Sequence, residues 1–291
     1  MILFRWAAAL LLIAVGSTGA AHAQGATDIF VASLRQSGRS VTIGPPVNVT
    51  RRPGYDNQPS FTPDGASLLY TSIGEDGRAS AWKIRLAGRG TPVRLTSTPL
   101  GIYSPTVMPD GKSVSVIRVE PDSTQRLWKF PLDGGEPTLV LDRIKPVGYH
   151  AWVDARTLVV FVLGDPATLQ VVDLVTGNAT PVATNIGRAL VKVPHHNAVN
   201  FVKIVPDSGQ WVAEYTLATK STRRLGRLPE GAAYVAWTPR GALLTASGSR
   251  IYRWNDGTWI VAADFAAAGV RNISRLAISP SGDQLAFVAE D

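Results

Sequence analysis

A short motif recurs at near-constant spacing along the chain and constrains its fold more than any other feature. The stretch SFTPDGASLLYTS at 60–72 returns as TVMPDGKSVSVIR at 106–118. In each copy an apolar residue, which we call the marker, precedes a turn sequence and a β-rich run. Successive markers are 46, 45, 41, 44 and 41 residues apart, a period typical of four-stranded β-propeller blades. The six markers are Phe61, Val107, Trp152, Val193, Trp237 and Ile278.

The residue types of the motif explain the turn. Proline presets φ near about −65°, aspartate bonds its own downstream backbone, and glycine accepts the positive φ that other residues resist. We therefore predict a hairpin turn between the first and second strands of each blade. Runs such as SLLYTS and TLVVFVL behind the turns have the composition of strands. Five of the six residues just before the markers are small, which suits innermost strands crowded around an axis.

The third strand of a blade has its own signature, and it predicts how the ring closes. Trp82 and Trp128 each lie 21 residues after their marker, but the same spacing after Ile278 passes the last residue, Asp291. The last blade therefore lacks two strands, which 29–34 and 41–50 can supply. We predict an all-β, six-bladed propeller of four-stranded blades, with one composite blade closed by N- and C-terminal strands. An open β-sandwich array is the competing fold, and it leaves sheet edges unpaired.

The first residues have the pattern of an export signal. One early cation, Arg5, precedes an apolar run and the small-residue site Ala21-His22-Ala23. We predict a signal peptide over 1–23 and a single propeller domain over 24–291, located in the periplasm. A membrane anchor is the alternative, but the apolar run is about half of the ~20 residues that a span needs.

Charge and composition give a weak indication of partners. The formal net charge is +7, and removing 1–23 leaves +6. The cations are scattered singly or in pairs, without the like-charge blocks of an interaction tail. We expect no nucleic-acid partner, no transmembrane segment after signal removal, and a monomer. The chain has no cysteine, so disulfides cannot stabilise it.

The motif resembles a known repeat. SFTPDGASLLYTS and TVMPDGKSVSVIR are similar to the WD40-like repeat of the periplasmic translocation protein TolB and its relatives. The resemblance covers about 28–291 and is weakest at Trp152 and Val193, where Pro-Asp-Gly is missing. It implies an exported, six-bladed ring. TolB itself has a further N-terminal domain, for which this chain has no room, so we expect a TolB-like propeller rather than TolB.

Signatures of enzymes are missing from the sequence. The G-x-S-x-G elbow of a propeller-gated peptidase does not occur. His195 and His196 occupy the turn slot of the fourth repeat, and no metal-binding spacing surrounds them. The expected inner strands carry no carboxylate, unlike lactonase-type propellers. We therefore predict no catalytic residue, no metal and no cofactor.

Tyrosine recurs just ahead of the expected inner strands, where the loops between blades open onto the central funnel. Tyrosine and arginine are enriched where interfaces carry binding energy. We predict a partner-binding funnel rim, although the same tyrosines could simply pack the loop ends. The rim comprises Tyr55, Tyr103, Tyr149, His150, Arg188, Tyr234 and Arg271.

These features favour a non-enzymatic propeller that serves as a binding platform for an envelope protein or peptide. The alternative is a lyase or hydrolase that acts on an anionic envelope glycan in the central funnel.

Overall fold

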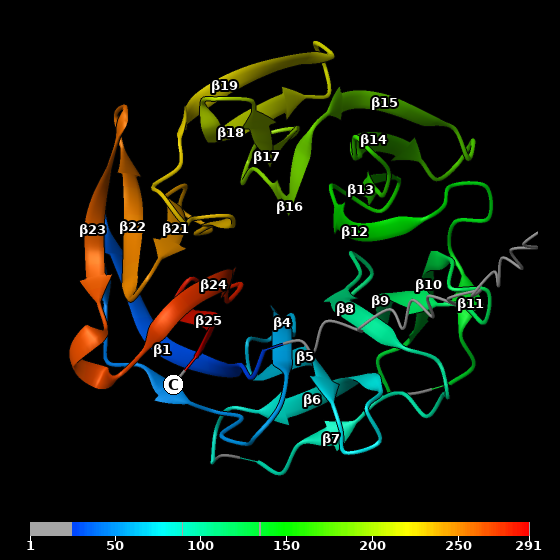
Figure 1. Cartoon of the computed structure of the whole chain (residues 1–291), viewed down its shortest axis with the longest axis horizontal. Coiled ribbons are helices and arrows are strands. Elements are labelled where there is room, and N and C mark those ends of the chain that lie inside the picture. The colour runs from blue at the N-terminus through cyan, green and yellow to red at the C-terminus, as the bar shows by residue number, and fades with distance from the viewer. Residues whose placement is uncertain (1–24, 89, 134, 291) are drawn as a thin grey trace, which may run out of the picture.

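The protein is a closed ring of six four-stranded blades around a central axis (Figure 1). The computed structural model describes residues 25–88, 90–133 and 135–290. The signal peptide predicted over 1–23 lies outside the described residues. The fold class predicted from the repeat, including closure by the two ends of the chain, is confirmed.

Blades 1 to 3 are each built from four consecutive antiparallel strands, which follow one another from the axis outward. Blade 1 contains β4 (Asp56–Phe61), β5 (Ser67–Ile73), β6 (Ala79–Arg85) and β7 (Val93–Arg94). Blade 2 contains β8 (Ile102–Val107), β9 (Ser113–Val119), β10 (Gln125–Pro131) and β11 (Thr138–Leu139). Blade 3 contains β12 (Val147–Trp152), β13 (Thr157–Val162), β14 (Thr168–Asp173) and β15 (Ala179–Thr184).

Blades 4 and 5 repeat this plan, and blade 6 joins the two ends of the chain. Blade 4 contains β16 (Ile186–Lys192), β17 (Ala198–Val205), β18 (Gly209–Thr216) and β19 (Ser221–Arg227). Blade 5 contains β20 (Val235–Trp237), β21 (Leu243–Ser247), β22 (Arg250–Asn255) and β23 (Thr258–Asp264). Blade 6 contains β24 (Arg271–Ile278), β25 (Gln284–Glu290), β1 (Asp28–Ser37), and an outer edge split into β2 (Ser40–Ile43) and β3 (Val47–Asn48). A short 3₁₀ helix, η1 (Ala266–Ala268), links blades 5 and 6.

Closure depends on one antiparallel pairing between the ends of the chain. β1 pairs with β25 from Asp28 opposite Ala289 to Ser33 opposite Gln284. Side chains of the two strands alternate between two hydrophobic clusters, because successive residues of a strand point to opposite faces. Phe30 and Phe287 face blade 5, whereas Ile29 and Val288 face blade 1. The N-terminal strand thus fills the core on both sides of its blade.

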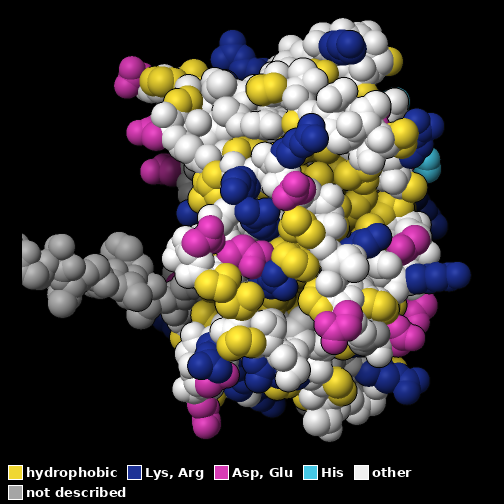
Figure 2. All heavy atoms as spheres, turned by 90° about the vertical axis from the view of Figure 1, so that its right-hand side faces the viewer, with side chains coloured by type: hydrophobic (Ala, Val, Ile, Leu, Met, Phe, Trp, Pro, Cys, Tyr) yellow, Lys and Arg dark blue, Asp and Glu magenta, His cyan; other side chains and the backbone are white. Residues whose placement is uncertain are grey.

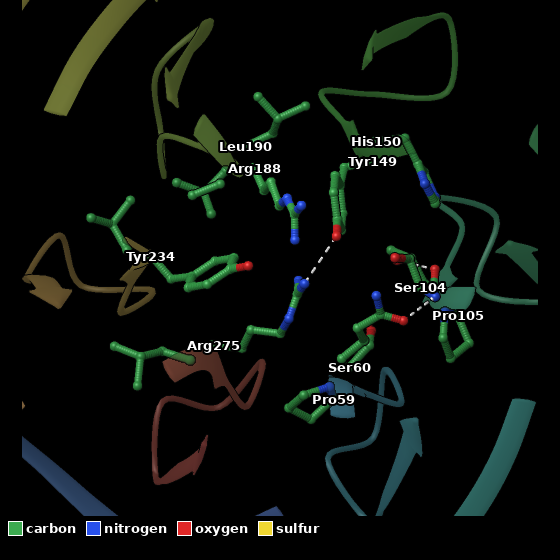
Figure 3. Close-up of a pocket in the computed structure, with 16 residues that line it drawn as sticks. Pro59, Ser60, Ser104, Pro105, Tyr149, His150, Arg188, Leu190, Tyr234 and Arg275 are labelled. Atoms are coloured by element: carbon green, nitrogen blue, oxygen red, sulfur yellow. Dashed lines mark hydrogen bonds between the residues drawn. The ribbon is translucent and has the colours of Figure 1, made fainter. Parts of the chain in front are cut away.

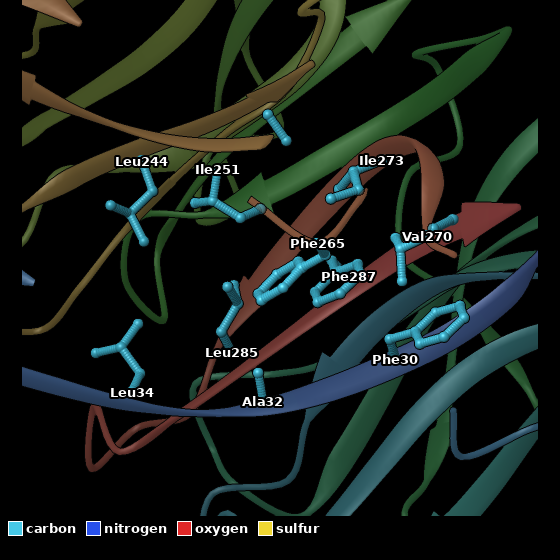
Figure 4. Close-up of a cluster of buried hydrophobic side chains, with 12 residues drawn as sticks. Phe30, Ala32, Leu34, Leu244, Ile251, Phe265, Val270, Ile273, Leu285 and Phe287 are labelled. Atoms are coloured by element: carbon cyan, nitrogen blue, oxygen red, sulfur yellow. The ribbon is translucent and has the colours of Figure 1, made fainter. Parts of the chain in front are cut away.

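The cluster between blades 5 and 6 is the largest apolar contact made by the composite blade (Figure 4). Phe287 is fully buried, with its ring stacked between Phe30 and Phe265 at centroid distances of 5.5 Å each. Burying one such ring stabilises the fold by about 1.5–3 kcal/mol relative to leaving it exposed. Leu34 and Leu285 extend the cluster along both strands. The ends of the chain are therefore held together by packing as well as by the strand ladder.

Tight turns connect each inner strand to the second strand of its blade. In blade 1, Gly65 has φ of +68° and donates a 2.8 Å hydrogen bond to the carbonyl oxygen of Thr62. The carboxylate of Asp64 accepts hydrogen bonds from Ala66 N–H and the Thr62 hydroxyl, at 3.0 and 2.6 Å. In blade 4 the left-handed φ, +60°, falls at His195, one position earlier in the turn, while His196 N–H makes the hydrogen bond equivalent to that of Gly65. These turns all lie at one end of the ring axis.

The inner strands are irregular where they line the axis. Pairing shifts register in β4, β8, β12, β16 and β24, as expected at β-bulges. A bulge bends a strand and redirects its side chains. Gln58 and Ser104 lie within two of these bulges with left-handed φ of 59° and 53°. The bulges therefore help to decide which side chains reach the axis.

The outer surface mixes charges of both signs. Figure 2 shows Lys and Arg side chains lying among Asp and Glu side chains, with apolar patches between them, on the side of the ring formed by blades 2 and 3. Arg39 and Asp256, and Arg250 and Asp264, form exposed ion pairs elsewhere on the surface. Within the described part of the chain, no helix meets the length and hydropathy of a membrane span.

Candidate functional site

Three cavities follow one another along the axis, because each shares residues with the next. The funnel, about 630 Å³, opens where the inner strands begin and extends toward blades 2 and 3. The waist, about 160 Å³, lies in the middle of the ring. The lower mouth, about 650 Å³, opens where the inner strands end. The side chains that line the funnel differ from those that line the lower mouth, so the two ends of the axis are not equivalent.

The waist is lined by one equivalent residue from each of the six blades. Each of these residues stands three positions before the marker of its repeat, and we call the set the waist ring. It consists of Gln58, Ser104, Tyr149, Leu190, Tyr234 and Arg275. A ring of six positions thus carries only one formal charge, that of Arg275.

Arg275 extends across the waist from β24. Its Nη2 donates a 3.1 Å hydrogen bond to the phenol oxygen of Tyr149, on β12 of blade 3 (Figure 3). The guanidinium carbon lies 5.1 Å from the ring centroid of Tyr149 and 4.5 Å from that of Tyr234. These distances are within the range of cation–π attraction. Two aromatic rings and one hydrogen bond therefore hold this side chain in the channel.

A second cation reaches the waist from blade 4. Arg188 lies within the bulge of β16, and Figure 3 shows its guanidinium group pointing toward that of Arg275. Both arginines line the funnel as well as the waist. The two like charges thus approach one another at the point where the funnel narrows.

Three of the tyrosines around these arginines, Tyr55, Tyr103 and Tyr234, have raised pKa values and are neutral at physiological pH. Burial raises the pKa of Tyr55 to about 12, although Arg275 lowers it. Burial likewise raises the pKa of Tyr103 and of Tyr234 above the ordinary phenol value. Burial alone would lower the pKa of the Arg275 guanidinium, but the neighbouring tyrosine oxygens outweigh it and raise that pKa. Arg275 therefore stays charged, and the phenols of Tyr55, Tyr103 and Tyr234 carry no negative charge that would balance it.

A side-chain hydrogen-bond network fixes the opposite wall of the waist. The amide oxygen of Gln58 accepts a 2.7 Å hydrogen bond from Ser104 N–H and another of 2.7 Å from the Thr71 hydroxyl. Because Gln58 belongs to blade 1 and Ser104 to blade 2, the network joins neighbouring blades. It also satisfies a backbone donor that the bulge of β8 removes from the ladder.

His150 lies deeper, between the waist and the lower mouth. Its side chain is 8% exposed, and its Nε2 lies 2.7 Å from the Ser115 hydroxyl oxygen. That hydroxyl also accepts a 2.9 Å hydrogen bond from Trp152 Nε1. Burial lowers the pKa of His150 to about 4, so the imidazole is neutral at physiological pH. Its Nδ1 has no hydrogen-bond partner among the described residues.

The lower mouth is mainly apolar. The markers and the prolines of the turns surround it, including Phe61, Trp152 and Pro239. Lys192 is the one Lys or Arg among the described residues that line it. The cationic, tyrosine-lined surface is therefore confined to the funnel and the waist.

Most of the predicted rim residues lie around the funnel and waist. Tyr55, Tyr103, Tyr149 and Arg188 line the funnel, and Tyr234 lines the waist. Two of the tyrosines are placed differently from the prediction: Tyr103 lies inside β8 and Tyr149 inside β12, rather than ahead of the strands. The bulges bring them to the axis from within the strands.

The structure separates one predicted residue from the rim and adds another. Arg271 is exposed at the start of β24 and is outside the linings of the funnel and waist. Arg275, four residues later, takes the central position. The sequence does contain the signal for it, because Arg275 stands three residues before Ile278, as Tyr234 stands before Trp237.

The expectation that the inner strands carry no carboxylate is wrong. β4 begins at Asp56, which is fully buried and accepts hydrogen bonds of 3.2 and 3.0 Å from Nε and Nη2 of Arg52. Burial raises the pKa of Asp56 despite this pairing. Its side chain is outside the linings of the funnel, waist and lower mouth. In the described residues, no group of three or more His, Cys, Asp or Glu is arranged to hold a metal ion.

Solved structures provide the comparisons, since no protein-family model and no curated protein matches the chain. A protein from Agrobacterium tumefaciens provisionally assigned as TolB superposes with a TM-score of 0.70 at 17% identity, covering 91% of this chain and 99% of that one. TolB from Acinetobacter baumannii gives 0.59 at 15% identity, covering 91% of this chain and 64%, under two thirds, of that one. An oligogalacturonate lyase in complex with manganese gives 0.51 at 15% identity, covering 92% and 98%. The fold is therefore similar to that of TolB-like six-bladed propellers, and propeller enzymes share it.

Proposed function

We propose that the protein is an exported, non-enzymatic propeller that binds a protein or peptide of the cell envelope in its funnel. The observation that carries this proposal is the funnel lining, where Tyr55, Tyr103, Tyr149, Arg188 and Arg275 meet in one concave surface. Tyrosine and arginine are the residue types that most often dominate binding energy at protein interfaces.

The size and shape of the funnel support a partial insertion of the ligand. Its volume of about 630 Å³ is within the ~300–1,000 Å³ of ordinary ligand pockets. The waist behind it is about 160 Å³, and Arg275 crosses it. An exposed loop or chain end could therefore enter the funnel while the body of the partner rests on the surrounding loops.

The solved neighbours support the proposed setting. Two of them are described as TolB proteins, and they have the same fold. The Pro-Asp-Gly motifs, which resemble the WD40-like repeats of that family, point the same way. A periplasmic location would follow from the predicted signal peptide over 1–23.

The proposal can be tested by crosslinking and capture in the envelope of the source cells. Tagged protein comprising 24–291 is compared with a variant in which Tyr103, Tyr149 and Tyr234 are all changed to alanine. We expect one envelope protein to be captured specifically by the wild type and lost from the variant. The purified pair should then differ in affinity by at least about tenfold, or about 1.4 kcal/mol.

A matched control uses a tyrosine outside the funnel. Tyr252→Ala on β22 should capture the partner as the wild type does. Thermal unfolding of each variant shows whether it is folded. The platform proposal fails if the folded triple variant binds the purified partner within about twofold of the wild type.

A second candidate function is an enzyme that acts on an anionic glycan. The observation that favours it is His150, which lines the waist together with Arg188 and Arg275 and whose Nδ1 has no hydrogen-bond partner among the described residues. A structural neighbour, the oligogalacturonate lyase, has the same fold. Turnover of an envelope polyuronate that is abolished by His150→Gln and by Arg188→Gln would establish this function in place of the platform.

A further inference from the structure

The waist holds two positive charges without a compensating negative one. Neither Arg188 nor Arg275 is among the salt bridges formed by the described residues. The described residues that line the waist include no Asp or Glu. Glu290 lines the funnel farther out, where its carboxylate accepts a 2.7 Å hydrogen bond from the Asn272 side chain. Among the described residues, no carboxylate at the waist balances the positive charges of Arg188 and Arg275.

Bringing two guanidinium groups together is unfavourable because their charges repel, and the partial burial of Arg275 adds to the cost by reducing its hydration. Tyr149 and Tyr234 present ring faces to Arg275, and burial keeps the phenols of Tyr55 and Tyr234 neutral, so these two phenols add no negative charge. An anion between the two groups would convert the repulsion into two attractive contacts.

The side chains at the waist favour a carboxylate. Guanidinium groups are planar forks that bind carboxylates through two parallel hydrogen bonds. Arg188 and Arg275 extend from blades 4 and 6, so they can approach a planar group from two sides (Figure 3). The phenol of Tyr149, held by Arg275, provides a further hydroxyl at the same place.

The volumes indicate what accompanies the carboxylate. The waist, at about 160 Å³, is below the ~300–1,000 Å³ of ordinary ligand pockets, so it suits one functional group rather than a whole ligand. The funnel shares Arg188 and Arg275 with the waist and can hold the rest of the ligand. The anionic group should therefore lie at the tip of the segment that enters the funnel.

We propose that the waist is a carboxylate-binding site, in which Arg188 and Arg275 together hold an acidic side chain or the C-terminal carboxylate of the inserted peptide. This inference deepens the proposed function and rests on it for the peptide nature of the ligand. Arg275 donates one hydrogen bond from Nη2 to Tyr149, and its remaining N–H groups are the ones that we expect to hold the carboxylate.

The test uses defined probes and isothermal titration calorimetry with protein comprising 24–291. Three acetylated peptides share one Gly/Ser sequence. The first has a central Asp and an amidated C-terminus, the second a central Asn and a free C-terminus, and the third a central Asn and an amidated C-terminus. Inorganic phosphate is the fourth probe. We expect the first or second peptide to bind at least about tenfold more tightly than the third, with affinity that falls as salt is added.

Arginine variants locate the site. Arg275→Gln and Arg188→Gln should each weaken the better carboxylate peptide by about tenfold. Arg271→Gln is the matched control, because it removes an arginine from the same strand, β24, outside the funnel and waist. If Arg275→Gln does not fold, Arg188→Gln, which changes an exposed side chain, still provides the test.

Three results would overturn the carboxylate site: equal binding of the uncharged peptide, unchanged affinity in both arginine variants, or binding of phosphate without binding of either carboxylate peptide. Its failure is distinguishable from failure of the platform. If an envelope partner is captured equally by wild type and Arg188→Gln but lost from the tyrosine variant, the platform stands and the carboxylate site does not. If a carboxylate peptide binds but no protein is captured, the carboxylate site stands and the platform proposal does not.

Discussion

Arg275 and Tyr149 lie on opposite blades of the ring and are joined by a 3.1 Å hydrogen bond across its axis. They are 126 residues apart in the sequence. In a six-bladed ring, blades 3 and 6 face one another, so this bond spans the channel at its narrowest point. It adds a direct contact across the axis between β12 and β24, which the closed ring otherwise holds apart only through the intervening blades.

Removing the phenol oxygen of this hydrogen bond should slightly lower the stability of the protein without ligand. We expect Tyr149→Phe to lower the free energy of unfolding by about 1–2 kcal/mol, because a hydrogen bond from a charged donor is lost while the aromatic ring remains. Urea unfolding at neutral pH measures the change. Tyr103→Phe makes the same chemical change at a phenol that Arg275 does not contact through a hydrogen bond, and it should stay within about 0.5 kcal/mol. Equal losses in both variants would contradict this role for Tyr149.

His150 should make stability depend on pH between about 4 and 6.5. Its pKa falls from 6.5 to about 4 on folding because burial disfavours the imidazolium. The unfolded chain therefore binds the proton more readily, so stability is lost as the pH falls through this window. The full shift corresponds to about 3 kcal/mol.

The measurement for His150 is the slope of unfolding free energy against pH. His150→Gln should flatten it between pH 6.5 and 4, whatever its effect on stability at neutral pH. His196→Gln, in an exposed turn, is the matched control and should keep the wild-type slope. A wild-type slope in the His150 variant would show that other groups cause the pH dependence.

Closure of the ring should depend on the aromatic stack in blade 6. Phe287→Ala removes a fully buried ring from between Phe30 and Phe265, and it should cost about 3–5 kcal/mol. Val261→Ala, at a side chain that is 53% exposed on β23, should change stability by less than about 0.5 kcal/mol. The midpoint of urea unfolding reports both. A loss below about 1 kcal/mol for Phe287→Ala would mean that the strand ladder alone closes the ring.

The backbone conformation at Ser104 predicts that a glycine variant is more stable than an alanine variant. Ser104 has φ of 53°, which is unfavourable for any residue with a Cβ. Ser104→Gly and Ser104→Ala both remove the hydroxyl, and we expect the glycine variant to be more stable by about 1 kcal/mol. At Ser60, which is not among the positive-φ residues, the order should reverse by about 0.5–1 kcal/mol. Thermal or urea unfolding of the four variants tests both orders.

The fold could be predicted from the sequence because the repeat signals are local. Turn residues such as Asp64 and Gly65 fix their own backbone through bonds to near neighbours. The spacing of Trp82 and Trp128 from their markers shows which strands the last blade lacks. Closure then follows from pairing the leftover strands, because an unpaired edge is unfavourable.

The centre of the site was harder to predict because it depends on bulges that no motif marks. Tyr103 and Tyr149 lie at different positions relative to their markers, yet the bulges of β8 and β12 bring both to the funnel. Arg271 and Arg275 differ by four residues on one strand, and only Arg275 stands at the waist-ring position. Alignment of the six repeats at that position would have found it. Asp56 was missed because β4 begins in a stretch whose Asp, Asn and Pro residues have the composition of a loop.

The pairing of β1 with β25 has a consequence for how the protein can form. β25 lies between β24, its neighbour in the sequence, and β1, at the other end of the chain. The last blade therefore cannot assemble until nearly all of the chain is available, and the pairing of β1 with β25 has the largest sequence separation among the strand pairings of the described residues. Contacts of this kind form slowly, because loop-closure entropy is lost before they stabilise the fold. A chain shortened at either end would keep five complete blades but leave an open, adhesive sheet edge, so completion of the ring also protects the protein from aggregation.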